Sequence, residues 1–278
     1  MAALTRLRSA ATTFGRPDRR ADTLDAYERR APAPANAVDI FKGQWASRLP
    51  PPYDTLTGGA APLYEDPRLV AALDVLGGVR GMRILELGPL EGGHTYLLDR
   101  AGASHIRAIE GNTRAFLRCL IVKELLGMPA AHFECGDFLQ YLRGTPERVD
   151  LAIASGVLYH MMNPVELLAR LAPVADAIYI WTHYYDEGLL AARATTARRV
   201  VVPEEADYQG YRHRVYRFEY GAALERDDFC GGNRPEARWL SRSDILGALA
   251  HVGYSRVHPY YEQPDHPHGP AFSLVARR

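Results

Sequence analysis

From residue 66 onward, short apolar runs alternate with longer stretches that are apolar on one side. The first pattern is typical of buried strands and the second of amphipathic helices. We expect strands at residues 84–87, 105–109, 131–135, 149–154 and 177–181. We expect helices at residues 94–98, 114–126 and 164–172, after an earlier helix that begins with Asp66 as N-cap and Pro67 in the first turn and runs to Gly77. This alternation predicts an α/β fold with a parallel sheet and helices on both faces.

The alternation is interrupted between Tyr185 and Arg238. Residues 200–203 and 215–220 predict two strands joined through residues 204–214, and Trp239 then opens a final helix at 243–251 followed by strands near 257–261 and 272–276. The whole pattern predicts a Rossmann-like fold with a mostly parallel seven-stranded sheet and an insertion at 186–238. Because an insertion after the fifth strand lies above the carboxyl edge of the sheet, we interpret it as a lid that selects the substrate. A surface hairpin whose tyrosines pack for their area is an equal alternative.

The N-terminal region differs in composition from the rest. Residues 1–35 are polar, charged and rich in Pro and Ala, which predicts a flexible segment. We therefore divide the chain into an N-terminal segment at 1–65, whose later part is expected to cover the active site, and a catalytic domain at 66–278.

The run Arg-Ile-Leu-Glu-Leu-Gly-Pro-Leu-Glu-Gly-Gly at 83–93 predicts a strand that breaks into a glycine-rich turn before a helix. Glycine lets a ligand approach the backbone, and N–H groups at a helix start can receive polar groups. Leu90 stands where a dinucleotide fingerprint needs a glycine, so that motif is not matched. Glu86, Gly88 and Gly92 instead match the first motif of class I S-adenosylmethionine (SAM)-dependent methyltransferases, and Leu90 is expected to alter the bend around the methionine end. An ordinary strand–turn–helix is the alternative.

Two later strand ends support a nucleoside site. Glu110 follows Gly88 by about 20 residues, the spacing at which a strand-terminal acid meets ribose hydroxyls. The third strand leads into Gly136, Asp137 and Phe138. In the methyltransferase pattern, an Asp at this position reaches the adenine amino group and an apolar neighbour lies beside the ring. The three strand ends together predict SAM as the cofactor.

Composition narrows the classes of partner. The chain has 278 residues, with 33 Lys and Arg against 33 Asp and Glu, so its formal net charge is zero. This balance disfavours a dedicated nucleic-acid binder without excluding a local basic patch. No apolar run approaches the roughly 18 residues that cross a bilayer, so we expect no membrane partner. Three well-separated cysteines offer no disulfide framework, which predicts a cytoplasmic protein.

The segment Ser-Gly-Val-Leu-Tyr-His-Met-Met-Asn-Pro at 155–164 carries a family resemblance. It resembles the segment that follows the fourth strand in tRNA wobble-uridine carboxymethyltransferases, which use carboxy-SAM, and in related SAM-dependent methyltransferases. The likeness extends over about residues 80–175. It implies Tyr159 and His160 at the reacting centre, a cofactor site that contains Glu86, Gly88, Gly92, Glu110 and Asp137, and a contribution from Ser155. Lys42 and Trp45 resemble the basic and aromatic N-terminal segment of that family, so we include them as substrate-binding candidates.

Histidine is the candidate for proton transfer. His160 follows the fourth strand, and an unperturbed histidine titrates near neutral pH. His160 could instead cap the following turn or pack against the cofactor. His183, at the end of the fifth strand, is a second candidate. Because one His and Asp186 are too few ligands, we expect no metal. The remaining substrate-binding candidates are Tyr184, Tyr208, Tyr211 and Arg214.

Three functions remain open. The first is O- or N-methylation of a small molecule or sugar. The second is carboxymethyl transfer to tRNA, which needs a cationic group near the extra carboxylate and a basic approach surface. The third is displacement within SAM itself that releases methylthioadenosine, which needs a closed pocket. A non-catalytic SAM-binding module is a fourth and less favoured hypothesis.

Overall fold

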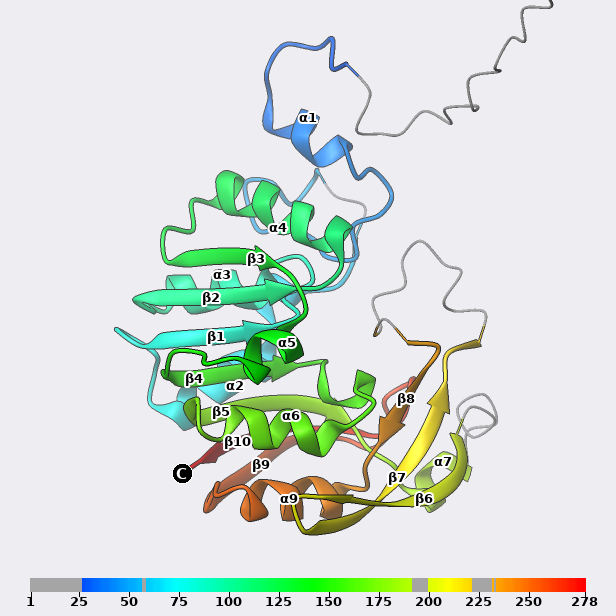
Figure 1. Ribbon diagram of the computed structural model, residues 1–278. Helices are drawn as coiled ribbons and strands as arrows, with labels where there is room; N and C mark the ends of the chain where they lie inside the picture. The colour runs from blue at the N-terminus through cyan, green and yellow to red at the C-terminus, as the bar shows by residue number, and fades with distance from the viewer. Residues whose placement is uncertain (1–26, 57–58, 192–199, 222–231, 233) are drawn as a thin grey trace, which may run out of the picture.

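The computed structural model describes residues 27–56, 59–191, 200–221, 232 and 234–278. Its main sheet has seven strands in the order β3-β2-β1-β4-β5-β10-β9. The first five strands are parallel, and β10 runs antiparallel to both of its neighbours. The predicted mostly parallel seven-stranded sheet is therefore confirmed (Figure 1). The strands are β1 (Arg83–Leu87), β2 (His105–Glu110), β3 (Ala131–Cys135), β4 (Val149–Ser155), β5 (Ala175–His183), β9 (Arg256–Gln263) and β10 (Ala271–Arg277).

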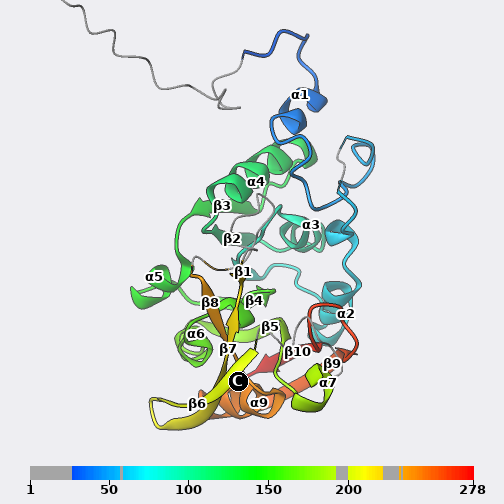
Figure 2. The ribbon, with the colours of Figure 1, turned by 90° about the vertical axis from the view of Figure 1, so that its right-hand side faces the viewer.

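Helices cover both faces of this sheet (Figure 2). On one face, α2 and α3 enclose a core with Ile84, Ile106 and Tyr179; on the other, α6 and α9 enclose a core with Leu85, Ile178 and Phe272. The predicted start of α2 is confirmed, since the Asp66 side chain accepts a hydrogen bond from the Arg68 N–H. The helices of this domain are α2 (Pro67–Leu76), α3 (Gly93–Arg100), α4 (Thr113–Leu126), α5 (Phe138–Arg143), α6 (Pro164–Leu171) and α9 (Arg242–His251), with the short helix η3 (Leu158–His160) after β4.

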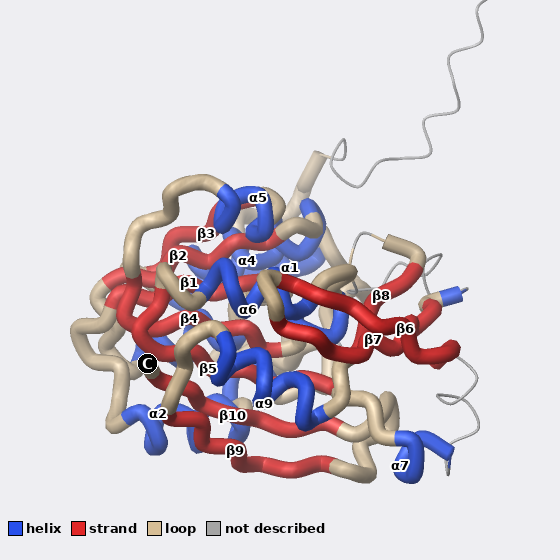
Figure 3. Tube along the Cα trace, turned by 60° about the horizontal axis from the view of Figure 1, so that its bottom comes forward, coloured by secondary structure: helices blue, strands red, loops and turns tan. Residues whose placement is uncertain are grey.

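The insertion forms a second, three-stranded antiparallel sheet in the order β6-β7-β8 (Figure 3). This sheet lies beside the carboxyl ends of the parallel strands, toward which their arrows point (Figure 1). Its elements are α7 (Glu187–Ala191), β6 (Val200–Tyr208), β7 (Tyr211–Glu219) and β8 (Glu236–Trp239). The expected linker at 204–214 is wrong, because those residues continue both strands as far as a turn at Gln209 and Gly210. Charged residues on the exposed side of this hairpin obscured the strand pattern, and β8 was not predicted.

The tip of this hairpin docks on α9. The Tyr211 hydroxyl donates a hydrogen bond to the Asp244 carbonyl at 3.0 Å. Gly247 makes room for that hydroxyl, because a Cβ atom at Gly247 would collide with it. The tip is thus held at the side of the domain, by α9.

The N-terminal segment packs along α4. Its elements are α1 (Pro34–Asp39) and the short helix η2 (Leu63–Glu65). Val38, Phe41, Trp45, Leu49 and Tyr64 form a buried cluster with residues of α4 and β3. Residues 1–26, the larger part of the segment expected to be flexible, lie outside the described residues. Among the described residues, no helix is long and apolar enough to cross a membrane.

The docked hairpin tip generates a stability prediction. Tyr211→Phe should lower the free energy of unfolding by about 1 kcal/mol, because the substitution removes one hydrogen bond and leaves the ring in place. Urea unfolding measures this change. Arg214→Ala is the matched control on the same strand, since its ion pair with Glu205 is exposed and should contribute little. Equal stability of Tyr211→Phe and the wild type would contradict this account of docking.

Candidate active site

The carboxyl ends of four neighbouring parallel strands are each followed by a glycine: Gly88 after β1, Gly111 after β2, Gly136 after β3 and Gly156 after β4. A Cβ atom at Gly111 would meet only the Gly136 carbonyl oxygen, at 3.5 Å, and one at Gly136 would meet nothing within 4 Å. Packing therefore does not require glycine at these two positions. Without side chains there, a strip of backbone is open to a flat ligand. We call Gly88, Gly111, Gly136 and Gly156 the glycine strip.

Two buried acids border this glycine strip. Glu86 is 2% exposed, and Thr95 is its one hydrogen-bond donor among the described residues, at 2.5 Å. Glu110 is 8% exposed and accepts the N–H groups of Leu90 at 3.0 Å and Asn112 at 2.8 Å. Burial raises the pKa of both carboxyls. A carboxylate offers about four acceptor sites, so both acids retain capacity for a ligand that is cationic or carries hydroxyls.

The turn after β1 holds a strained residue. Leu90 has φ 57°, in the left-handed region that favours glycine, and Gly92 follows with φ 74° as the N-cap of α3. Leu90 therefore adopts the conformation of a glycine in spite of its side chain. Such a backbone persists only where its surroundings hold it, and here the Leu90 N–H is bound by Glu110.

Asp137 and Phe138 begin α5 beside the same edge. The Asp137 Oδ1 atom caps the helix by accepting the Leu139 N–H at 2.8 Å. Asp137 is exposed and Phe138 is partly buried. Their assignment to the adenine stays a prediction.

Tyr159, from η3, is the centre of an aromatic and histidine cluster next to Gly156. Its ring centroid lies 4.1 Å from that of His160, 4.6 Å from His183 and 5.9 Å from Trp181. His183 in turn stacks on Trp239 of β8, with 5.4 Å between ring centroids. A Cβ atom at Gly156 would lie 3.8 Å from both the Tyr159 hydroxyl and the Trp181 ring. The cluster therefore directly adjoins the glycine strip, and it contains all three predicted catalytic residues.

The surroundings of His183 fix its protonation. Its Nδ1 atom lies 2.9 Å from the Gly269 carbonyl oxygen. Since a carbonyl only accepts, Nδ1 carries the proton, and Nε2 of the neutral ring keeps its lone pair. Burial, reinforced by His266, lowers the pKa of His183 to about 3.

His160 is also neutral. Burial lowers the pKa of His160 to about 4, and the Nδ1 atom of His160 lies 2.5 Å from the Tyr220 hydroxyl of the insertion. Both rings are neutral at pH 7.

An acid at the start of α2 connects the glycine-rich turn with the aromatic cluster. Asp66 is 3% exposed and lies 2.7 Å from Nε2 of His94, on α3. Its carboxylate also pairs with Arg68 at 2.6 Å, and the Arg68 guanidinium lies 4.2 Å from the Trp181 ring centroid. These two partners hold the pKa of Asp66 well below its usual range against the opposing effect of burial. The sequence predicts Asp66 only as a helix cap.

Several predicted substrate contacts lie elsewhere. Tyr184 is buried in the core on the opposite face from Trp181 and packs on Phe272. Tyr208 and Tyr211 pack against that core through the hairpin tip, and Arg214 is exposed and paired with Glu205. Among the described residues of the insertion and β8, Tyr220 and Trp239 contact the cluster, and their positions depend on strand register that the sequence did not reveal.

The two N-terminal candidates also lie outside the cluster. Trp45 is 6% exposed, and its indole N–H donates to the Val38 carbonyl at 2.9 Å. This placement gives Trp45 a packing role. Lys42 is exposed in the turn after α1.

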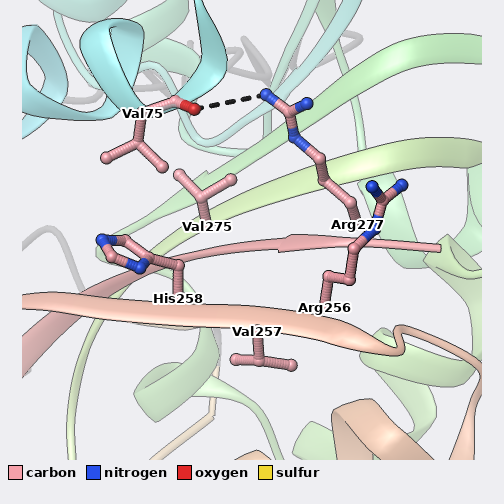
Figure 4. Close-up of a pocket in the computed structure, with 6 residues that line it drawn as sticks. All are labelled: Val75, Arg256, Val257, His258, Val275 and Arg277. Carbon is pink, nitrogen blue, oxygen red and sulfur yellow. Dashed lines mark hydrogen bonds between the residues drawn. The ribbon is translucent and has the colours of Figure 1, made fainter.

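A narrow pocket, too small to admit a water molecule, touches Tyr159, His183 and Arg238. A cavity of about 540 Å³ lies elsewhere, between the end of α2 and the strands β9 and β10, where Arg277 donates to the Val75 carbonyl (Figure 4). It is away from the carboxyl ends of the parallel strands, and Arg277, one of the two arginines that line it, is occupied in capping α2. No cluster of three metal-ligating side chains occurs in the described parts of the chain.

Comparisons with known proteins identify the fold. No family model and no curated protein matches the sequence. The N-terminal domain of EvdMO1, solved in the presence of S-adenosylhomocysteine (SAH) and D-fucose, is 22% identical with a TM-score of 0.64, over 87% of this chain and 93% of that one. A SAM-dependent methyltransferase from Mesorhizobium loti is 17% identical with a TM-score of 0.52, over 78% and 100%.

A third solved structure agrees. Magnesium protoporphyrin IX methyltransferase (ChlM) from Synechocystis PCC 6803 with bound SAH is 17% identical with a TM-score of 0.51, over 76% of this chain and 80% of that one. The chain thus has the fold of class I SAM-dependent methyltransferases. The resemblance to the tRNA carboxymethyltransferases stays a prediction from sequence.

The neutral, buried histidine predicts a pH effect on stability. Because the pKa of His183 is lowered from 6.5 to about 3 by folding, the unfolded chain binds a proton that the folded protein does not. Its contribution to stability is therefore lost as the pH falls below about 6.5, by about 1.4 kcal/mol per pH unit. Urea unfolding between about pH 7 and 5 should show a shallower loss in His183→Asn than in the wild type. His258→Asn, at an exposed histidine on β9, is the control, and parallel curves for all three proteins would contradict the prediction.

Proposed function

We propose that the protein transfers a methyl group from SAM to a hydroxyl or amine of a small, sugar-like acceptor. One observation carries this proposal: a glycine strip bordered by two buried acids directly adjoins a cluster with a neutral histidine. The glycine strip and its two acids suit a nucleoside with a charged tail. The neutral histidine suits removal of a proton from an acceptor bound next to that nucleoside.

The residues at the strand ends fit SAM. Glu110 has the position and the remaining acceptor capacity for ribose hydroxyls, and the glycine strip leaves room for the nucleoside. Glu86 is a buried carboxylate with one hydrogen bond, so a cation nearby would offset the cost of its burial. SAM is cationic and supplies, when bound, a methyl group activated by its sulfonium.

His183 is the candidate general base. The Gly269 carbonyl holds the ring in one tautomer, and the stacked Trp239 ring limits its orientation. Nε2 therefore holds a lone pair for the acceptor proton as the methyl group is transferred, while the burial that lowers the pKa of His183 also makes the ring a weaker base than free histidine. The rest of the protein's contribution to the rate of methyl transfer is mostly the alignment of the reacting groups. Tyr159 touches both histidines and is the candidate for that alignment, with His160 held by Tyr220 as a second polar group.

The cluster also holds two donors that suit a polar acceptor. The indole N–H groups of Trp181 and Trp239 are buried and have no hydrogen-bond partner among the described residues. An indole only donates, so a ligand oxygen that reached either group would satisfy it. Aromatic walls with a few polar groups are typical of small-molecule sites. The presence of D-fucose with the similar EvdMO1 domain supports a sugar-like acceptor.

A second candidate function is favoured by one observation. The pocket beside Tyr159 and His183 is too narrow to admit a water molecule, whereas ligand pockets usually measure roughly 300–1,000 Å³. So little room for an acceptor suits a reaction within SAM that releases methylthioadenosine without any acceptor.

Product analysis separates the two candidates. We expect the purified protein to leave SAM unchanged on its own and to form SAH when sugars or other small acceptors are added. Mass spectrometry of the mixtures measures this. Methylthioadenosine from SAM alone would instead support the second candidate.

Variants test the two parts of the site separately. Glu110→Ala should weaken SAH binding about tenfold or more, because buried ribose hydroxyls lose their acceptor. His183→Asn keeps a donor for Gly269 and removes the base, so turnover should fall by about a hundredfold with SAH affinity retained. Calorimetry and turnover assays measure these effects, with His258→Asn as the control. Full turnover in His183→Asn would contradict the assignment of the base.

A further inference from the structure

Glu91 lies in the glycine-rich turn but takes no part in the site described above. It is fully buried, at 0% exposure. Its two carboxylate oxygens accept the backbone N–H groups of Ala46 and Ser47, each at 2.9 Å. A buried carboxylate is costly unless it is paired and hydrogen-bonded, and here its partners come from a segment 44 to 45 residues earlier in the chain.

The same segment meets the turn at further points. Arg118 of α4 lies 3.2 Å from the Glu91 carboxylate and also donates to the Gln44 carbonyl. The Tyr64 hydroxyl donates to the backbone carbonyl of Glu91 at 2.5 Å. At the start of α3, a Cβ atom at Gly93 would lie 2.7 Å from Cβ of Leu63, so only glycine permits this approach. We call residues 34–56 and 59–65 the N-terminal strap.

The strap is thereby connected to the candidate ribose site. Glu91 follows Leu90, the residue with φ 57° whose N–H is held by Glu110. An unfavourable backbone conformation of this kind needs support from its surroundings. Glu110 accepts a hydrogen bond from the N–H of Leu90, and the strap donates hydrogen bonds to the side chain of Glu91, the next residue of the turn.

We propose that Glu91 is a positioning residue through which docking of the N-terminal strap and binding of the cofactor stabilise one another. The inference rests on the proposed function, since it takes SAM or SAH as the ligand at Glu110. A ligand that needs the turn in this conformation favours the docked strap. By thermodynamic reciprocity, the docked strap must favour the ligand to the same degree.

Hydrogen exchange of the full chain, with and without SAH, tests the coupling at the Ala46 and Ser47 amides. We expect SAH to slow their exchange in the wild type. Glu91→Gln keeps the shape of the side chain but loses one acceptor, so exchange at both amides should rise and SAH affinity should fall about tenfold or more. SAH slows exchange through global unfolding at every amide, so the coupling requires that Ala46 and Ser47 be slowed more than the amides of α9, and that this excess be lost in Glu91→Gln.

Two further variants keep the test decisive. Glu166→Gln is the matched control, because Glu166 is 9% exposed and paired with Arg143 on α5, away from the strap. It should leave SAH affinity and the two amides unchanged. Tyr64→Phe removes one hydroxyl and should weaken SAH binding roughly threefold or more even where Glu91→Gln fails to fold.

The outcomes separate this inference from the proposed function. If the wild type binds SAH while exchange at Ala46 and Ser47 stays the same, or if Glu91→Gln and Tyr64→Phe retain full affinity, the coupling is overturned and SAM binding stands. If SAH does not bind the wild type, the proposed function fails and the inference fails with it.

Discussion

The structure depends on one constraint, the parallel direction of the first five strands. Parallel strands end at a common edge, and side chains or turns at those ends become neighbours however far apart they lie in sequence. Here that edge gathers Glu110, the four glycines and His183. The rest of the chain either covers the faces of this sheet or packs around its edge.

The turn after β1 shows how the edge is held in shape. Leucine at position 90 takes a conformation that costs a residue with a side chain of order 1 kcal/mol or more. Glu110 binds the Leu90 N–H, and Glu91 binds the backbone of the N-terminal segment. The departure of Leu90 from the glycine pattern is visible in the sequence. Its compensation is not, because the partners of Glu91 are backbone groups and leave no trace in the sequence.

Much of the fold was predictable because it depends on local patterns. The strands between residues 66 and 183, the helices α2, α3, α4 and α6, and the last two strands follow from apolar periodicity, glycine stops and the Asp66 cap. Helix α5 was not predicted, because Asp137 and Phe138 at its start were assigned to the adenine. The catalytic candidates were also found locally, since Tyr159, His160 and His183 follow strands that end at the common edge. The structure brings these three together.

The contacts of the insertion were not predictable in the same way. Tyr208, Tyr211 and Arg214 were predicted to bind the substrate because they lie in the insertion expected above the carboxyl edge of the sheet, yet the turn at Gln209 carries them to α9 or into solvent. Tyr220 and Trp239 reach His160 and His183 instead. Which side chains of a hairpin face a site depends on its register and on where its tip docks. Both are tertiary properties that a single sequence does not display.

Burial by the insertion also determines the chemistry of the histidines. Desolvation disfavours the imidazolium form, so enclosure between Trp181 and Trp239 keeps His183 neutral far below its ordinary pKa. A ring protonated before the acceptor arrived could not remove a proton from it. In the described part of the site the same enclosure leaves little space beside Tyr159. A separate acceptor would need room there in addition to SAM, whereas a reaction within SAM would need none. The degree of closure that keeps the candidate base His183 neutral is thus the property that distinguishes the two candidate functions.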